Sequence, residues 1–262
     1  MRHPFFESTR PLVFAHRGGA ALAPENTIAA FDKGLATGAD GIELDVRLSR
    51  DGVVVVHHDA TLDRTTDRRG AVAALDEREL ARVDASYRFS QAGTHPFRGR
   101  GIGVPALGEV LRRYRDRRVI VEMKINSAEF AAAVVEAVRS ADAVDRVCLG
   151  SFGRRALRAA RELEPALATS AAREEVRWAL YRSWLGWPVS RPSYAGYQVP
   201  ERAEATRIVS PGFIRSSHAA GLGVQVWTVD TEADASRLVN WGVDGLITNR
   251  PDLLVPLVQT IY

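Results

Sequence analysis

The chain has 262 residues, of which 46% are hydrophobic and 26% are charged, and its formal net charge is +3. These values are typical of a globular protein and exclude a disordered chain. A charge this small and dispersed gives no indication of a nucleic-acid partner. The single cysteine, Cys148, excludes an internal disulfide and a cysteine-based zinc cluster. The length suits one α/β barrel or two small domains.

Two further features bear on location. The sequence has no run of about 18 apolar residues, so we expect no transmembrane segment. Residues 1–14 lack the apolar stretch and the small-residue cleavage site of a secretory signal. We therefore predict a cytoplasmic protein.

The positive charges are unevenly divided, with 33 Arg and only two Lys, Lys33 and Lys124. A coding bias that replaces Lys with Arg explains most of this difference. Lys is nevertheless a compact point charge, whereas Arg is a rigid planar fork. The two lysines are therefore positions to examine for chemistry that Arg cannot perform.

Short apolar runs alternate with segments of helical spacing, such as residues 27–37, 129–140, 154–163 and 231–241. Alternating βα units of this length are typical of a (β/α)8 TIM barrel or of a doubly wound open sheet. The candidate strands are residues 12–15, 41–46, 53–57, 119–123, 146–150, 166–169, 195–199, 224–229 and 245–248.

Nine candidate strands compete for eight places in a barrel. Residues 49–52 contain an Asp-Gly pair, which is typical of a hairpin, but a helix-free crossover is also within reach of the chain. The sequence leaves these two alternatives open. Residues 60–104 are polar and glycine-rich, and we interpret them as a long insertion. We predict a single α/β domain over residues 1–262, a TIM barrel with this excursion after the third strand candidate.

Barrel enzymes carry their reacting groups at the C-terminal ends of the strands. In an extended strand, residues two apart share a face, so Glu43 lies beside Asp45 and Glu122 lies beside Lys124. Three carboxylates at one rim cannot all stay ionised without a cation. Because the ligands are oxygen atoms, the pattern favours a hard divalent ion, Ca²⁺ or Mg²⁺.

Two histidines follow candidate strands and are candidates for an acid/base pair. His16 follows the first strand and His58 the third, and imidazole titrates near neutral pH. Arg17 and Lys124 supply positive charge for an anionic substrate, which a phosphate group would fit.

Each of these patterns also has a structural interpretation. Glu-x-Asp is common in salt bridges, and His-His-Asp occurs in loops and caps. We assign Asn26 and Thr27 to a helix N-cap. We expect His3, His95 and His218 to pack or to lie at the surface. His57 lies on the opposite side of the extended chain from His58, so we expect it to pack elsewhere or to support the site residues from behind.

Eight segments carry a more specific pattern. They read AHRGG at residues 15–19, APENT at 23–27, GADGIELDV at 38–46, VVHHDATLDRTT at 55–66, VEMK at 121–124, GSF at 150–152, VWTV at 226–229 and GVDGLIT at 242–248. In this order they resemble the glycerophosphodiester phosphodiesterase family. The resemblance covers residues 12–254.

This resemblance implies a barrel of the phosphatidylinositol-phospholipase-C-like type that hydrolyses glycerophosphodiesters to glycerol 3-phosphate and an alcohol. The attacking group would be the glycerol 2-hydroxyl, through a cyclic phosphate, or water directly, and the resemblance favours the first. The implied site has one divalent ion on Glu43, Asp45 and Glu122, an acid/base pair of His16 and His58, phosphate contacts from Arg17 and Lys124, and an apolar wall formed by Trp227.

The sequence departs from the family pattern at two positions. Asp230 stands where Asn often occurs, and Asn249 stands where Asp often occurs. Both lie outside the proposed metal and acid/base residues, so they affect the expected substrate details.

Two other functions remain open. Three tryptophans and a tyrosine, Trp178, Tyr181, Trp184 and Trp187, lie within ten positions. They indicate helix packing, a dimer contact or a peripheral membrane contact, and the last would suit phospholipase-D-like hydrolysis of lysophospholipids. A non-catalytic phosphate- or lipid-binding barrel is the third alternative. The sequence does not predict the oligomeric state.

Overall fold

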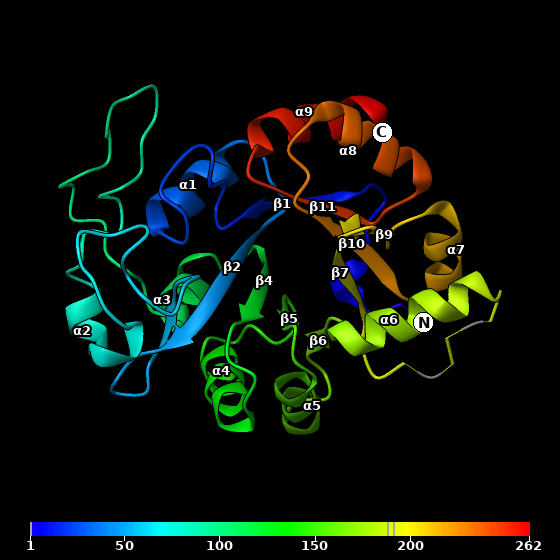
Figure 1. The fold of residues 1–262 in the computed structure, drawn as a ribbon, viewed down its shortest axis with the longest axis horizontal. Helices are drawn as coiled ribbons and strands as arrows, with labels where there is room; N and C mark the ends of the chain where they lie inside the picture. The colour runs from blue at the N-terminus through cyan, green and yellow to red at the C-terminus, as the bar shows by residue number, and fades with distance from the viewer. Residues whose placement is uncertain (1, 188, 191) are drawn as a thin grey trace.

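Eight parallel strands form a closed barrel in the computed structural model, which describes residues 2–187, 189–190 and 192–262 (Figure 1). A parallel bridge between Ser170 and Gly196 joins the two ends of the sheet. This confirms the predicted TIM barrel. In order around the barrel, the strands are β6 (Ala168–Thr169), β5 (Val147–Gly150), β4 (Arg118–Met123), β2 (Gly41–Leu48), β1 (Leu12–His16), β11 (Gly245–Thr248), β10 (Gly223–Trp227) and β7 (Gly196–Pro200).

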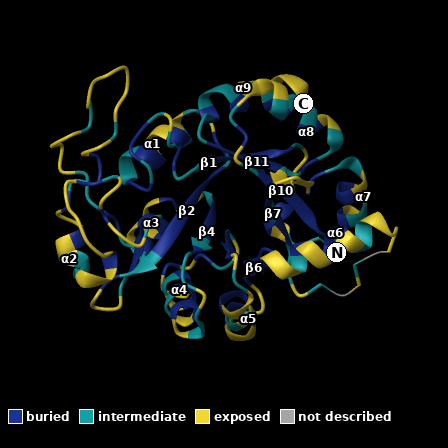
Figure 2. Cartoon of the chain, viewed as in Figure 1, coloured by how far each residue is buried: buried dark blue, intermediate teal, exposed yellow. Residues whose placement is uncertain are grey.

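Helices surround the strands, and their inner faces are buried while their outer faces are exposed (Figures 1 and 2). Side chains at Thr27, Ser127, Ser210 and Thr231 cap four of them by accepting a backbone N–H bond. The main helices are α1 (Ile28–Ala36), α3 (Leu107–Arg113), α4 (Ala128–Ser140), α5 (Arg154–Leu163), α6 (Arg173–Trp184), α7 (Pro211–Ala219), α8 (Glu232–Trp241) and α9 (Pro251–Ile261).

Alternation along the strands separates two buried layers. On β2, Ile42 and Leu44 belong to the core between strands and helices. Inside the barrel, a second core includes Phe14 and Ile120 together with Phe6 of the short helix η1 (Pro4–Phe6). Phe6 approaches the backbone so closely that a Cβ at Gly223 would lie only 2.3 Å from its ring. The aromatic rings thus fill one end of the barrel interior. The polar residues Glu43, Asp45 and Glu122 lie further toward the C-terminal ends of their strands.

The ninth candidate strand is not part of the barrel ring. β3 (Val54–Val56) pairs antiparallel with β2, with Val46 opposite Val56 and Leu48 opposite Val54. Gly52, at φ 81°, occupies the turn. The structure therefore resolves the open alternative in favour of a hairpin.

The long segment after β3 returns to the place where it starts. Val55 forms an antiparallel bridge with Ala106, and the Val56 N–H donates to Pro105 O at 2.9 Å. Between them lie η2 (Val72–Ala74) and α2 (Glu77–Leu80), over a small core of their own that contains Leu62, Val72, Leu80 and Val104. A second short hairpin, β8 (Arg202–Ala203) and β9 (Thr206–Arg207), follows β7. The domain limits remain a sequence prediction.

None of the helices in the described part of the chain is both long and apolar enough to cross a membrane.

Candidate active site

Strand register brings the three predicted carboxylates together. His16 on β1 pairs with Glu43 on β2, and Asp45 pairs with Glu122 on β4. One oxygen from each of Glu43, Asp45 and Glu122 lies within 4.8 Å of the others. The alternate residues on β2 pack against the helices, which directs Glu43 and Asp45 to the inside of the barrel.

The proximity of these groups perturbs their titration. Burial, followed by the charges of Asp45 and Glu122, raises the pKa of Glu43 well above its usual range. Burial also raises the pKa of Glu122. Burial acts in the same direction on Asp45, but Lys124 and Arg17 outweigh it and lower the pKa of that carboxyl. Burial and the neighbouring carboxylates thus oppose ionisation of Glu43 and Glu122, whereas Lys124 and Arg17 favour the charged form of Asp45.

The donor set fits a hard divalent cation. All three candidate ligands are carboxylates, and Glu43 and Asp45 are almost fully buried. The buried Oε1 of Glu122 lies 3.1 Å from Lys124 Nζ but makes no well-formed hydrogen bond with any described group. This leaves a buried acceptor directed at the cluster. Oxygen atoms alone do not distinguish Ca²⁺ from Mg²⁺.

Two cations contact the carboxylates. Lys124 Nζ lies 2.9 Å from Asp45 Oδ1. Although burial opposes the charge of Lys124, Asp45 and Glu122 raise its pKa, so the ammonium stays protonated. Arg17 donates its backbone N–H to Glu43 Oε2, and its Nε lies 3.2 Å from Asp45 Oδ2.

His16 is held by a short chain of polar groups at the ends of β11 and β10. Its Nδ1 lies 2.7 Å from Asn249 Oδ1, and Asn249 Nδ2 donates to Asp230 Oδ2 at 2.7 Å. The Asn249 backbone N–H also donates to Asp230. Burial and the charge of Arg17 lower the pKa of His16, so its ring is neutral at pH 7. With Nδ1–H directed at Asn249, Nε2 is free to accept a proton, 3.8 Å from Glu43.

His58 is held by a second chain, which connects the excursion to the β1 loop. Its Nδ1 lies 2.6 Å from Asp59 Oδ1. Although burial opposes it, Arg64 and His58 lower the pKa of Asp59 to about 2. Arg64 also donates to both oxygens of Glu25, which in turn accepts from Arg17. The structure thus orients His58 with charged groups from two separate loops.

Asn26 corrects one sequence assignment. Thr27 is the N-cap of α1: it has an extended backbone, and its Oγ1 accepts from the Ala30 N–H. Asn26 instead has a left-handed backbone, at φ 58°, which an N-cap does not have. Its side chain donates to Asp45 Oδ2 at 2.8 Å and accepts from the Asp45 N–H. Asn26 therefore positions a candidate metal ligand.

The remaining histidines lie away from the carboxylates. His57 is buried, and its Nε2 lies 3.1 Å from Thr61 O. His3, His95 and His218 contact Ala166 O, Phe89 O and Asp244 respectively.

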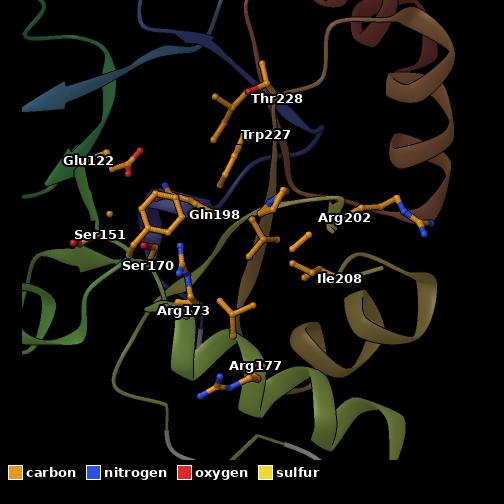
Figure 3. Close-up of a pocket in the computed structure, with 18 of the residues that line it drawn as sticks. Glu122, Ser151, Ser170, Arg173, Arg177, Gln198, Arg202, Ile208, Trp227 and Thr228 are labelled. Carbon is orange, nitrogen blue, oxygen red and sulfur yellow. The ribbon is translucent and has the colours of Figure 1, made fainter. Parts of the chain in front are cut away.

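Trp227 lies at the end of β10, and its ring meets the edge of Phe152 with centroids 6.1 Å apart. Both rings line a cavity of about 810 Å³ that also contains His16, His58 and Glu122. Figure 3 shows Glu122 on one side of this cavity and the helix α6, with Arg173 and Arg177, on the other. The predicted site residues thus line this one cavity, except Asp45, which lies behind it in contact with Lys124 and Arg17.

The aromatic residues near α6 do not form a packed core. Trp178, Tyr181, Trp184 and Trp187 are all exposed, so the helix-packing interpretation is wrong.

Comparison with known proteins gives the class and the family. The model of the glycerophosphoryl diester phosphodiesterase family matches residues 16–253. The chain is 32% identical over 261 residues to a glycerophosphodiester phosphodiesterase of Caldanaerobacter subterraneus subsp. tengcongensis, covering 95% of this chain and 98% of that relative.

Comparison with solved structures also finds phosphodiesterases of the same fold. A glycerophosphodiester phosphodiesterase from Agrobacterium tumefaciens is 30% identical with a TM-score of 0.76, covering 94% of this chain and 99% of that one. A phosphodiesterase from Oleispira antarctica, in complex with the product sn-glycerol-3-phosphate, is 27% identical with a TM-score of 0.77, covering 95% and 97%. The protein is therefore an enzyme, a phosphodiester hydrolase built on a (β/α)8 barrel. It belongs to the glycerophosphoryl diester phosphodiesterase family, which confirms the resemblance seen in the motifs.

Proposed function

We propose that this enzyme hydrolyses glycerophosphodiesters to glycerol 3-phosphate and an alcohol, with one divalent cation, Ca²⁺ or Mg²⁺. The observation that carries the proposal is the cluster of Glu43, Asp45 and Glu122, of which Glu43 and Glu122 line the same cavity as the two oriented histidines. A divalent cation held by the three carboxylates would supply positive charge next to the phosphate oxygens.

The other side chains of the site bind the phosphate, transfer protons and contact the apolar parts of the substrate. Lys124 and Arg17 bind the phosphate and favour the charge that develops on its oxygens. His16 Nε2 takes the proton from the attacking hydroxyl, which is the glycerol 2-hydroxyl or water. His58, whose Nδ1 is held by Asp59, gives a proton to the leaving alcohol. Trp227 forms the apolar wall beside the glycerol or the alcohol.

A coupled assay tests this proposal. Glycerol 3-phosphate released from glycerophosphocholine is measured with and without EDTA, over a panel of head groups. We expect release that EDTA abolishes and that added divalent cation restores. If no glycerophosphodiester gives EDTA-sensitive release, the non-catalytic phosphate- or lipid-binding barrel replaces this proposal. A cytoplasmic location remains a prediction from the sequence.

A further inference from the structure

His58, the proposed proton donor, lies in the segment after β3 and not on a strand of the barrel. Its backbone is fixed from outside, because the His57 N–H donates to Asp45 O and Arg47 Nε donates to His58 O, both at 2.9 Å. The ring is less enclosed, since the His58 side chain is 29% exposed. A partly exposed ring can change rotamer, so its direction depends on the groups that it contacts.

Asp59 contacts this ring but does not fix its direction alone. Its Oδ1 lies 2.6 Å from His58 Nδ1. Asp59 directly follows His58 in the chain, and its own side chain is 27% exposed, so the two side chains could turn together. The other oxygen, Oδ2, accepts from Arg64 Nε at 2.5 Å. Both oxygens of Asp59 are thus engaged, and the direction of the His58 ring depends on what holds Arg64.

Arg64 is anchored outside the excursion. Its Nη1 and Nη2 donate to the two oxygens of Glu25, at 2.8 and 2.7 Å. Glu25 belongs to the loop between β1 and α1, and Figure 1 shows the excursion next to α1. Although burial opposes it, Arg64 and Arg17 lower the pKa of Glu25, so this anchor is ionised at neutral pH. A bidentate pair of this kind also fixes the angle of the guanidinium plane.

The same carboxylate holds the arginine that we propose binds the phosphate. Arg17 Nη1 donates to Glu25 Oε1 at 2.9 Å, and this oxygen also accepts from Arg64. Arg17 and His58 both line the cavity. One continuous series of contacts therefore joins two residues of the cavity wall, and it runs from His58 through Asp59, Arg64 and Glu25 to Arg17.

We propose that Arg64 is a positioning residue, which sets the proton donor His58 relative to the phosphate-binding Arg17. Three nitrogens of one rigid planar group make the contacts to Asp59 and Glu25, so the excursion and the β1 loop take one fixed arrangement. Lysine has a single nitrogen on a flexible stem and cannot reproduce this fork. The inference rests on the proposed function, because it uses the roles assigned there to His58 and Arg17.

Two substrates with different leaving groups test the contact with the proton donor. Choline needs a proton as it leaves, whereas p-nitrophenolate is a stable anion and needs none. In Arg64→Lys we expect kcat to fall by about 10- to 100-fold with glycerophosphocholine, and by about tenfold less with the p-nitrophenyl ester of glycerol 3-phosphate. Equal loss with both substrates would show that Arg64 does not act through the proton donor, and would overturn the inference.

Another arginine of the same kind provides a matched control. Arg50 also joins two carboxylates, Asp76 and Glu79, and its side chain is 54% exposed compared with 47% for Arg64. Arg50→Lys should keep kcat within about twofold of wild type with both substrates, because it breaks only an exposed ion pair.

His58→Ala is the reference for loss of the proton donor. It should show the same difference between the two substrates as Arg64→Lys, and a larger one. If His58→Ala shows the difference and Arg64→Lys does not, the inference alone is wrong. If His58→Ala shows no difference, the role of His58 in the proposed function is refuted, and the inference that depends on it is refuted as well.

The contact with Arg17 can be measured without turnover. Calorimetric titration with glycerol 3-phosphate, in the presence of Mg²⁺, should show binding that is about fivefold weaker in Arg64→Lys and in Glu25→Gln. The double variant should bind no more weakly than the weaker single variant, because both changes break the same series of contacts. Wild-type affinity in Arg64→Lys, or losses that multiply in the double variant, would show that Arg64 does not position Arg17 through Glu25, and would overturn the inference.

Discussion

Replacement of Lys124 with Arg isolates the role of shape at constant charge. Lys124 Nζ lies 2.9 Å from Asp45 Oδ1 and 3.1 Å from Glu122 Oε1, and its side chain is only 12% exposed. A guanidinium is longer and planar, so it cannot occupy the same point between these two carboxylates. Lys124→Arg therefore keeps the charge balance but displaces the cation.

The expected loss follows from the role proposed for Lys124. Removing one well-placed donor to a developing negative charge usually costs about 10²- to 10³-fold in turnover, or roughly 2.7–4 kcal/mol. Because the positive charge remains beside Asp45, we expect stability to fall by no more than about 1 kcal/mol. Removal of the charge itself, as in Lys124→Met, would leave buried carboxylates without their partner and cost about 3–5 kcal/mol.

The second lysine supplies the matched control. Lys33 lies exposed in the last turn of α1, and Lys33→Arg makes the same chemical change there. We expect kcat with glycerophosphocholine, at saturating divalent cation, to fall in Lys124→Arg and to stay within twofold of wild type in Lys33→Arg. Thermal denaturation of each variant confirms that it is folded. Full turnover in Lys124→Arg would refute the argument and reduce the two lysines to a result of coding bias.

Three more outcomes are expected. His58→Ala should lower kcat by about 10²- to 10⁴-fold while calorimetric metal binding is retained; near-normal turnover would contradict its assignment. A divalent cation at 100 times its dissociation constant should raise Tm by roughly 5–10 °C, from about 2.7 kcal/mol of binding free energy, and Glu43→Gln should weaken this shift; an equal shift in both proteins would place the ion elsewhere. Asn249→Asp would put two carboxylates where Asn249 now donates to Asp230 at 2.7 Å, at a cost of about 2 kcal/mol. The double variant Asp230→Asn with Asn249→Asp should recover this loss in chemical denaturation, and additive losses would show that the two residues are not coupled.

The hairpin shows where sequence reasoning reaches its limit. Residues 53–56 are four valines, a run typical of a barrel strand buried on both faces. β3 is indeed buried on both faces, but one cover is the excursion: Val55 packs with Leu62 and Leu80, whereas Val54 and Val56 join the layer under the helices. A run of apolar residues predicts that a strand is buried, but it does not predict which elements cover the strand. The four valines therefore did not distinguish a hairpin from a helix-free crossover.

The site could be predicted in part for a similar reason. Alternation along a strand places Glu43 beside Asp45, and this rule needs only local geometry. The contact of Asn26 with Asp45 depends on a left-handed loop residue, and Asn26 resembles a cap in sequence. The chain from His16 through Asn249 to Asp230 joins residues more than 200 positions apart, which no spacing rule predicts. The sequence did carry one indication of this contact, because Asp230 and Asn249 each hold the residue type that the family pattern often has at the other position.

The return of the excursion to its own starting point has a consequence for how such enzymes diversify. Because Val55 and Ala106 are bridged, the roughly fifty residues between them form a loop whose two ends are fixed side by side. Its length and composition can change without shifting the register of any barrel strand. His58, Asp59 and Arg64 all belong to this loop, so one segment carries both the proposed proton-transfer group and the groups that orient it. Replacement of this one loop, with these three side chains kept, can therefore change the substrate preference while the barrel stays the same.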